Sequence, residues 1–224
     1  PCAQCRRRRA AKAGTVRSMI TMSSLPDGYH ALVIGAGGAI GSAFVRQLQA
    51  DPRCGSVRGL HRPSTPPIDL ADPASIAAAA AAVGSDAPLH LLLVTSGVLH
   101  GDGFMPEKRL ADLDAQALET VHRINVVGPA MVLRHFTPLL DRQRSVVAML
   151  SARVGSIADN RLGGWYAYRA SKAALNMLLK TASSELRRTH PGAVVAALHP
   201  GTVRSALSRP FRGDQIGRAP DEAA

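Results

Sequence analysis

Short apolar runs alternate with longer segments of helical periodicity along most of the chain. Runs of strand length occupy residues 30–34, 89–95 and 146–150, and helical patterns occupy 74–83 and 115–142. Regular alternation of buried strands and helices is typical of a parallel sheet that is covered on both faces. The pattern therefore predicts an α/β fold.

The first of these strands runs directly into a glycine-rich turn. Gly35, Gly38 and Gly41 lie in the sequence Gly35-Ala-Gly-Gly-Ala-Ile-Gly41, and a helical pattern follows through Ala50. Glycines let the backbone approach a phosphate closely, and the helix start supplies free N–H groups and positive potential. An ordinary tight turn also contains glycines, but the order of strand, turn and helix favours a phosphate cradle.

Tyr168 and Lys172 lie four residues apart in a segment, 165–188, that is predicted to be one helix. Side chains at i and i+4 share a helical face, so the ammonium of Lys172 is expected beside the phenol of Tyr168. A nearby positive charge lowers the pKa of a tyrosine and suits it to general acid–base catalysis. A surface pair without chemistry is the alternative that the spacing alone leaves open.

With these motifs in this order, the chain resembles the short-chain dehydrogenase/reductase family over nearly everything from Tyr29 to Ala224. The family pattern TGxxxGxG is present with Ile34 for its threonine and Ala39 for its middle glycine, and the YxxxK pattern is intact. The resemblance implies one domain with a Rossmann-type doubly wound parallel sheet of strand order 3-2-1-4-5-6, flanked by helices. The family's last strand is not expected within this chain. The stretch from Arg153 to Tyr168 looks most like the C-factor-like branch.

The resemblance carries roles onto several residues. Tyr168 would be the general acid and base, and Lys172 would lower its pKa and hold the nicotinamide ribose. Asn125 would anchor a water that connects Lys172 to solvent. Besides Tyr168 and Lys172, the residues expected to bind the cofactor on this basis are Gly35, Gly38, Ile40, Gly41, Asp69, Leu70, Ser96, Gly97, Pro200 and Val203.

The turn after the second expected strand bears on the choice of cofactor. His61 and Arg62 stand there, and no carboxylate does. An acid at this place would bind the ribose 2′-hydroxyl of NAD, whereas an arginine pairs with the 2′-phosphate of NADP. The expected cofactor is therefore NADP, with a merely solvated Arg62 as the alternative.

The catalytic serine of the family has no direct counterpart in this chain. The pattern SSxxG places Ala152 where the serine that hydrogen-bonds the substrate carbonyl is expected. Ser151 is the first candidate, Ser156 is the second, and no serine at all is the third. Because successive strand residues face opposite sides, Ser151 need not point toward the substrate.

Composition and charge limit the other possibilities. The 224 residues are 46% apolar, enough for one sizeable core, and no apolar run approaches the roughly 20 residues of a membrane span. The net charge of +11 falls to +5 without residues 1–26, which hold six basic residues and no acid. Residues 1–28 are therefore expected to be a basic, disordered leader before a catalytic domain at 29–224. Binding to nucleic acid or to a membrane is not expected.

Cysteines argue against a metal site. Cys2 and Cys5 have the spacing of zinc ligands, but a structural zinc needs four ligands and only Cys54 remains. No metal is expected. Three scattered cysteines fit a reducing compartment, so a cytoplasmic location is expected, with a mitochondrial transit role for the arginine-rich leader as the alternative.

These expectations combine into an NADP-dependent oxidoreductase that acts on a small-molecule carbonyl or alcohol substrate. The resemblance also allows a homodimer or a homotetramer. Two alternatives stay open. A dinucleotide-binding signalling or sensor protein with weak or no turnover would tolerate Ala152, and a fragment or defective product would fit the unusual termini.

Overall fold

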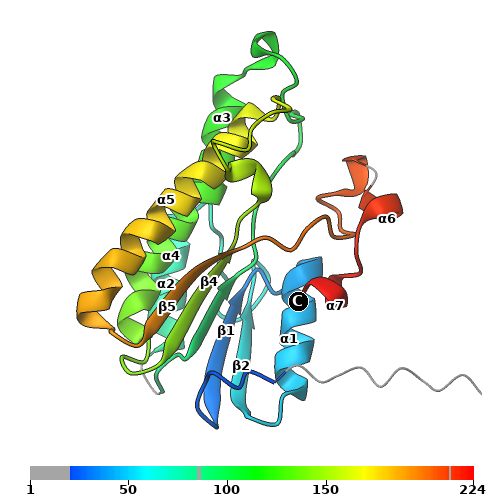
Figure 1. The fold of residues 1–224 in the computed structure, drawn as a ribbon. Helices are drawn as coiled ribbons and strands as arrows, with labels where there is room; N and C mark the ends of the chain where they lie inside the picture. The colour runs from blue at the N-terminus through cyan, green and yellow to red at the C-terminus, as the bar shows by residue number, and fades with distance from the viewer. Residues whose placement is uncertain (1–20, 85–86, 212) are drawn as a thin grey trace, which may run out of the picture.

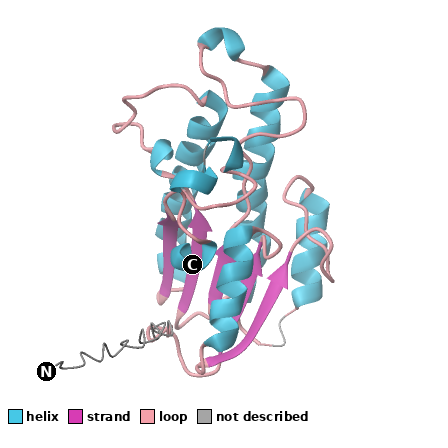
Figure 2. Cartoon of the chain, turned by 90° about the vertical axis from the view of Figure 1, so that its right-hand side faces the viewer, coloured by secondary structure: helices cyan, strands magenta, loops and turns pink. Residues whose placement is uncertain are grey.

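The computed structural model describes residues 21–84, 87–211 and 213–224. Within these ranges the strands form one parallel sheet in the order β2-β1-β3-β4-β5. Its members are β1 (Tyr29–Ile34), β2 (Cys54–Leu60), β3 (Leu91–Val94), β4 (Ser145–Leu150) and β5 (Ala193–Leu198). Figure 2 shows these strands side by side with helices on both sides of the sheet, which confirms the predicted α/β fold.

Two helical layers cover the sheet (Figure 1). On one face lie α1 (Ala39–Ala50) and the short α7 (Pro220–Ala223). On the other lie α2 (Pro73–Val83), α4 (Gly128–Phe136) and α5 (Tyr166–Thr189). The remaining helices are α3 (Ala115–His122), which leads into α4, and α6 (Gly213–Ile216) after β5.

Alternate residues of the central strands enter two separate cores. Leu92 and Val94 of β3 pack with α2, α4 and α5, whereas Leu91 and Leu93 pack with α1. The strands are therefore apolar on both faces, as a sheet between two helical layers requires. This double burial explains why they appear in the sequence as continuous apolar runs.

The segment predicted as one helix over 115–142 is broken in its middle. Residues Arg123–Val127 form a π-helical turn between α3 and α4, in which the N–H of Gly128 bonds to the carbonyl of Arg123, five residues back. Pro129 follows and has no N–H to offer the carbonyl four residues before it, which belongs to Asn125. Such turns often mark functional sites.

The predicted strand order is correct except at one edge. The order 3-2-1-4-5-6 includes a strand outside β2, but residues 61–72 form turns and bends instead. Pro63, Pro66 and Pro67 lie in this segment, and proline cannot donate to a strand ladder. At the opposite edge, no strand follows β5 within the described residues, as the sequence led us to expect.

The segment just before Tyr29, which was expected to belong to the leader, packs against the sheet. Of residues 1–28, the first twenty lie outside the described part, but Leu25 is only 2% exposed and belongs to the core beneath α1. The backbone N–H of Met22 also donates to Asp51, and Arg53 donates to the carbonyl of Leu25. The domain therefore includes residues before Tyr29. No helix in the described part of the chain is long and apolar enough to cross a membrane.

Candidate functional site

The expected site residues gather at the carboxyl ends of the strands, where parallel topology brings the loops after β1, β3, β4 and β5 to one edge of the sheet. Gly35 follows β1, and Ser96 and Gly97 follow β3. Ser151 follows β4 directly, and Pro200 comes shortly after β5. Topology therefore unites segments that are up to 165 residues apart in the printed sequence.

The glycine turn is tightly packed on its inner side and open on its outer side. Gly35 has φ +91°, and a Cβ there would lie 2.5 Å from the Ser96 hydroxyl. A Cβ on Gly41 would collide with the carbonyl of Gly35. Gly38, in contrast, is exposed and precedes α1 without a side-chain cap. The first intrahelical bond runs from Ser42 to Gly38, so the N–H groups of residues 39–41, including Ile40, are available to an anion.

The turn after β2 lies against the glycine turn. The ring of His61 would be 2.8 Å from a Cβ on Gly37, and the adjacent Arg62 is exposed. The Nδ1 atom of His61 is buried without a hydrogen-bond partner among the described residues. The exposed Arg62 thus follows directly after the histidine that packs against the glycine turn.

Asp69 and Leu70 are placed differently from each other. The Asp69 carboxylate accepts the N–H of Ala71 at 2.9 Å and is partly exposed. Leu70 is only 6% exposed, and its carbonyl lies 2.5 Å from where a Cβ on Gly128 would be. Leu70 thus packs closely against the start of α4 through both its carbonyl and its side chain.

Tyr168 and Lys172 lie one turn apart near the start of α5 and are both largely buried. The Lys172 ammonium lies 5.6 Å from the centre of the Tyr168 ring and donates to the carbonyl of Leu150 at 2.8 Å. Burial raises the pKa of Tyr168 to about 12 and lowers the pKa of Lys172 to about 8. Loss of solvent disfavours the phenolate, so the pKa of Tyr168 lies above its ordinary value, opposite in direction to the lowering expected from Lys172.

Asn125 connects this pair to the loop after β3. It is 1% exposed, its Oδ1 accepts the N–H of Val98 at 2.8 Å, and its Nδ2 donates to the carbonyl of Val98 at 2.8 Å. The same Nδ2 lies 3.1 Å from the hydroxyl of Ser171, which donates to the carbonyl of Tyr168. A Cβ on Gly97 would lie 3.4 Å from Asn125 and 3.5 Å from the Lys172 ammonium. A small side chain at this position would touch both groups at ordinary van der Waals distance, so the loop after β3 lies directly against them.

The hydroxyl of each candidate serine has a hydrogen-bond partner other than Tyr168. Ser151 is buried and donates to Oδ1 of Asn176 at 2.6 Å, two turns beyond Tyr168 on α5. Ser156 is exposed, and its hydroxyl accepts the N–H of Asp159 at 3.3 Å. A donor role of Ser151 toward a substrate would require its bond to Asn176 to exchange.

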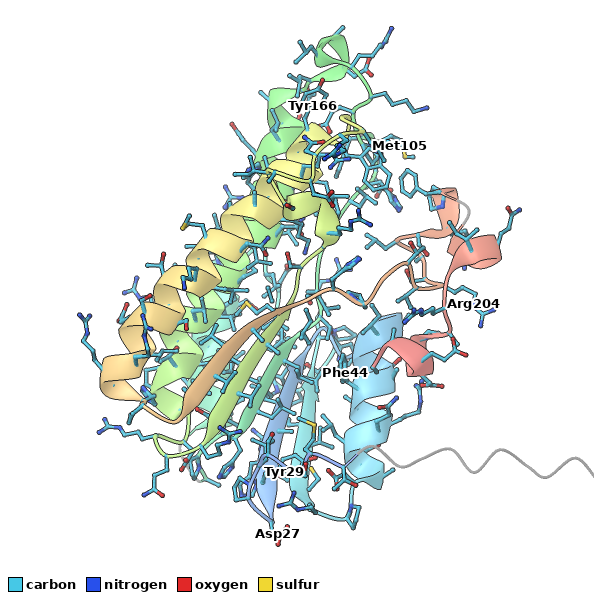
Figure 3. The ribbon with its side chains drawn as sticks, in the orientation of Figure 1. Asp27, Tyr29, Phe44, Met105, Tyr166 and Arg204 are labelled. Atoms are coloured by element: carbon cyan, nitrogen blue, oxygen red, sulfur yellow. The ribbon has the colours of Figure 1, made fainter. Side chains whose placement is uncertain are left out.

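Asn176, Glu107 and Trp165 also shape this site and were not expected from the sequence. The backbone N–H of Trp165 donates to the carbonyl of Glu107, and the Glu107 carboxylate accepts the N–H of Ala167 at 3.3 Å. The only signal in the sequence was a single tryptophan directly after Gly163-Gly164. Figure 3 shows Tyr166 and Met105, neighbours of these residues in sequence, in the same upper region of the molecule.

The loop after β5 completes this edge. Pro200 is half-buried, and Val203 is 4% exposed and forms an isolated parallel bridge with Arg218. Among the described residues, no group of three or more His, Cys, Asp or Glu side chains could hold a metal ion. Cys2 and Cys5 lie outside the described residues.

The parallel sheet and its glycine turn define a Rossmann-type fold. A family model described as Enoyl-(Acyl carrier protein) reductase matches residues 47–223. The chain is 32% identical over 159 residues to 1-hydroxy-2-glutathionyl-2-methyl-3-butene dehydrogenase of Rhodococcus sp. (strain AD45), covering 71% of this chain and 67% of that protein. It is 41% identical over 114 residues to C-signal of Myxococcus xanthus, covering 50% of this chain and 65% of that protein. The chain thus spans about two thirds of the length of these curated relatives.

Solved structures agree with these matches. NADPH-bound carbonyl reductase from chicken fatty liver is similar with a TM-score of 0.76 and 26% identity, covering 89% of this chain and 85% of that one. Carbonyl reductase Sniffer of D. melanogaster is similar with a TM-score of 0.73 and 23% identity, covering 88% of each chain. The chain belongs to the short-chain dehydrogenase/reductase family of oxidoreductases.

Proposed function

We propose that this protein is an NADP-dependent oxidoreductase that interconverts a small-molecule carbonyl compound and an alcohol, with Tyr168 as general acid and base. One observation carries the proposal. The Tyr168–Lys172 pair, with Lys172 buried and Tyr168 partly buried, lies at the same edge of the sheet as the uncapped start of α1. A proton donor and an anion cradle at one edge suit a reaction in which a phosphate-bearing cofactor meets a carbonyl.

The residues present fit a dinucleotide. Gly35 and Gly41 leave no room for a side chain between the turn and β3, and the backbone around Gly38 is open to a pyrophosphate. Arg62 is exposed beside the turn and can reach a 2′-phosphate. When bound, the nicotinamide ring supplies or accepts a hydride. That the similar chicken enzyme is described as NADPH-bound supports this choice.

The protein's own part is the proton. With a pKa raised to about 12 by burial, Tyr168 is a neutral phenol at physiological pH and can donate to a carbonyl oxygen that becomes an alcohol. Lys172, held beside it by the carbonyl of Leu150, stabilises the phenolate that forms. In the direction of alcohol oxidation the phenolate takes the proton back.

We extend the proposal to the other expected site residues. Asn125 keeps the loop after β3 and α5 in register, and Ser151 supports β4 through Asn176. The remaining cofactor residues are those that flank the cradle or follow β3 and β5. The same proposal includes a catalytic domain at 29–224, extended forward to residue 21, a cytoplasmic location, and a homodimer or homotetramer that light scattering would test.

The decisive experiment follows NADPH oxidation at 340 nm with a panel of aldehydes and ketones. Tyr168→Phe should lower kcat by about 100-fold or more and leave the Kd of NADPH within twofold, because the hydroxyl acts on the proton alone. Tyr166→Phe, the same change two residues away, should keep the wild-type rate. Retention of more than a tenth of the rate by Tyr168→Phe would refute the catalytic assignment.

A sensor function is the second candidate. It is favoured by the bond between Ser151 and Asn176, by Ala152, and by the 41% identity to C-signal. Tight NADPH binding without turnover of any carbonyl compound would establish it in place of the enzyme.

A further inference from the structure

Trp165 has an unusual backbone conformation directly before the catalytic helix. It is the only tryptophan of the chain, and its φ of 54° is the one positive value at a non-glycine residue in the described part of the chain. Left-handed backbone is unfavourable for a large side chain and persists only where the surroundings over-determine it. Such outliers gather at functional sites, so the placement of this ring calls for an explanation.

Contacts with Glu107 hold the strained residue. Gly163 and Gly164 lead into it, also with positive φ, and the Trp165 N–H donates to the carbonyl of Glu107. Glu107 is itself 5% exposed, and its carboxylate accepts the N–H of Ala167 in the first turn of α5. This carboxylate supplies the cap that the start of α5 lacks, since Trp165 has no side-chain capping bond.

The strain places the indole between Tyr168 and the loop that follows β5. The ring centres of Trp165 and Tyr168 are 6.2 Å apart with their planes at 73°. On its other side, Trp165 lies 5.1 Å from Phe211, which in turn lies 5.8 Å from His100. The Nε2 atom of His100 is 3.2 Å from the carbonyl of Leu207, which joins the loops after β3 and β5. We call Trp165, Phe211 and His100 the aromatic wall.

We propose that the aromatic wall makes this enzyme selective for planar, aromatic carbonyl compounds. The inference rests on the proposed function, in which the Tyr168 hydroxyl holds the carbonyl oxygen. A substrate in that position can extend toward the indole, because the ring centres of Trp165 and Tyr168 are only 6.2 Å apart. A flat ring can then make edge-to-face or offset contacts with Trp165 and Phe211, whereas a saturated ring is thicker and has no π face.

The test uses two unreactive carbonyl probes with equal carbon number, benzamide and cyclohexanecarboxamide. Trp165 is the sole tryptophan, so its emission after excitation at 295 nm reports directly on ligands at the wall. Each probe is titrated with and without saturating NADP⁺. Wild-type protein should bind benzamide about tenfold more tightly than cyclohexanecarboxamide.

Two variants separate the wall from general damage. Phe211→Leu keeps an apolar side chain and the reporter but removes one ring, so the two Kd values should come within about threefold. Phe44→Leu removes a ring on α1, outside the wall, and should keep the tenfold preference. Equal Kd values in the wild type, no emission change with either probe, or an unchanged preference in Phe211→Leu would each overturn the inference.

Turnover distinguishes this inference from the proposed function. The assay compares kcat/KM for benzaldehyde and cyclohexanecarbaldehyde with NADPH. If the protein prefers benzamide but reduces neither aldehyde, the selectivity of the aromatic wall is supported and the proposed enzymatic function is rejected. If both aldehydes are reduced with equal kcat/KM, the enzymatic function is supported and the selectivity of the aromatic wall is rejected. A kcat/KM ratio of about ten that falls in Phe211→Leu supports both.

Discussion

Asn125→Asp should destabilise the protein strongly at neutral pH and less in acid. The substitution keeps the Oδ1 acceptor for the N–H of Val98 and replaces the Nδ2 donor by an oxygen. That oxygen then faces the carbonyl of Val98 and the hydroxyl oxygen of Ser171, at a position that is 1% exposed in the wild type. Two hydrogen bonds are lost, and a carboxylate is buried opposite an acceptor.

The magnitude follows from these contacts. Each lost bond costs about 1 kcal/mol, and the unpaired buried acceptor adds about 1 to 3 kcal/mol, so a loss of about 3 to 5 kcal/mol is expected at pH 8. Burial and the facing oxygens raise the pKa of the new carboxyl group above its unfolded value. The penalty is therefore absent below the unfolded pKa of about 4, grows as pH rises, and is complete above the folded pKa. A protonated carboxyl group can donate to Val98 again.

Urea denaturation followed by circular dichroism at pH 5 and pH 8 measures the effect. The control is Asn160→Asp, the same chemical change at an exposed residue whose Oδ1 only accepts an N–H, from Gly163. We expect the control to stay within about 0.5 kcal/mol of the wild type. A loss at Asn125→Asp that is equal at both pH values, or smaller than that of the control, would show that the Asn125 amide is not the donor described.

Three further predictions address charge and chemistry. Burial lowers the pKa of Lys172 from 10.5 to about 8, so the unfolded state binds more protons than the folded state between these two pH values. The stability of the wild type relative to Lys172→Met should therefore rise by about 2 to 3 kcal/mol from pH 7 to pH 10. Urea midpoints of the two proteins that change in parallel with pH would contradict this. Arg62→Ala should remove most of an at least tenfold preference for NADPH over NADH in fluorescence titrations, since a charge-assisted contact is worth about 1.5 to 3 kcal/mol, and equal Kd values in the wild type would reject NADP. Ala152→Ser should raise kcat with a competent aldehyde, because residue 152 faces the opposite side of the strand from Ser151. Ser151→Ala should lower kcat less than tenfold, because the Ser151 hydroxyl is bonded to Asn176. A 100-fold loss of kcat in Ser151→Ala would instead show that Ser151 is the donor to the substrate.

Much of the fold could be predicted because its signals are local. Apolar runs of strand length, helical periodicity and the glycine turn each depend on neighbours within a few residues. The pairing of Tyr168 with Lys172 also follows from helix geometry alone, since one turn separates them. The missing strand outside β2 had a local signal as well, in Pro63, Pro66 and Pro67, which no ladder accepts.

The π-helical turn at Asn125 could not be predicted from the sequence in the same way. Pro129 indicates that the helix is disturbed, but proline is common in the first turn of a helix. Whether the helix then kinks, ends or takes up an extra residue in a π-helical turn depends on the residues that pack against it. Here the close approach of Gly128 to Leu70 and the bonds from Asn125 to Val98 decide it. These partners come from loops that only the folded sheet brings together.

The sequence by itself therefore determined the order of strands and helices, the glycine cradle, and the phenol and ammonium one turn apart. Only the tertiary structure decided how those groups behave. Burial, which no local pattern measures, turns the pKa of Tyr168 upward rather than downward. The bond of Ser151 to Asn176 and the position of Trp165 against Phe211 join segments far apart in the sequence. Such contacts depend on the packing of the whole chain. For this physical reason the sequence could predict where the site residues lie, but not their pKa values or their hydrogen-bond partners.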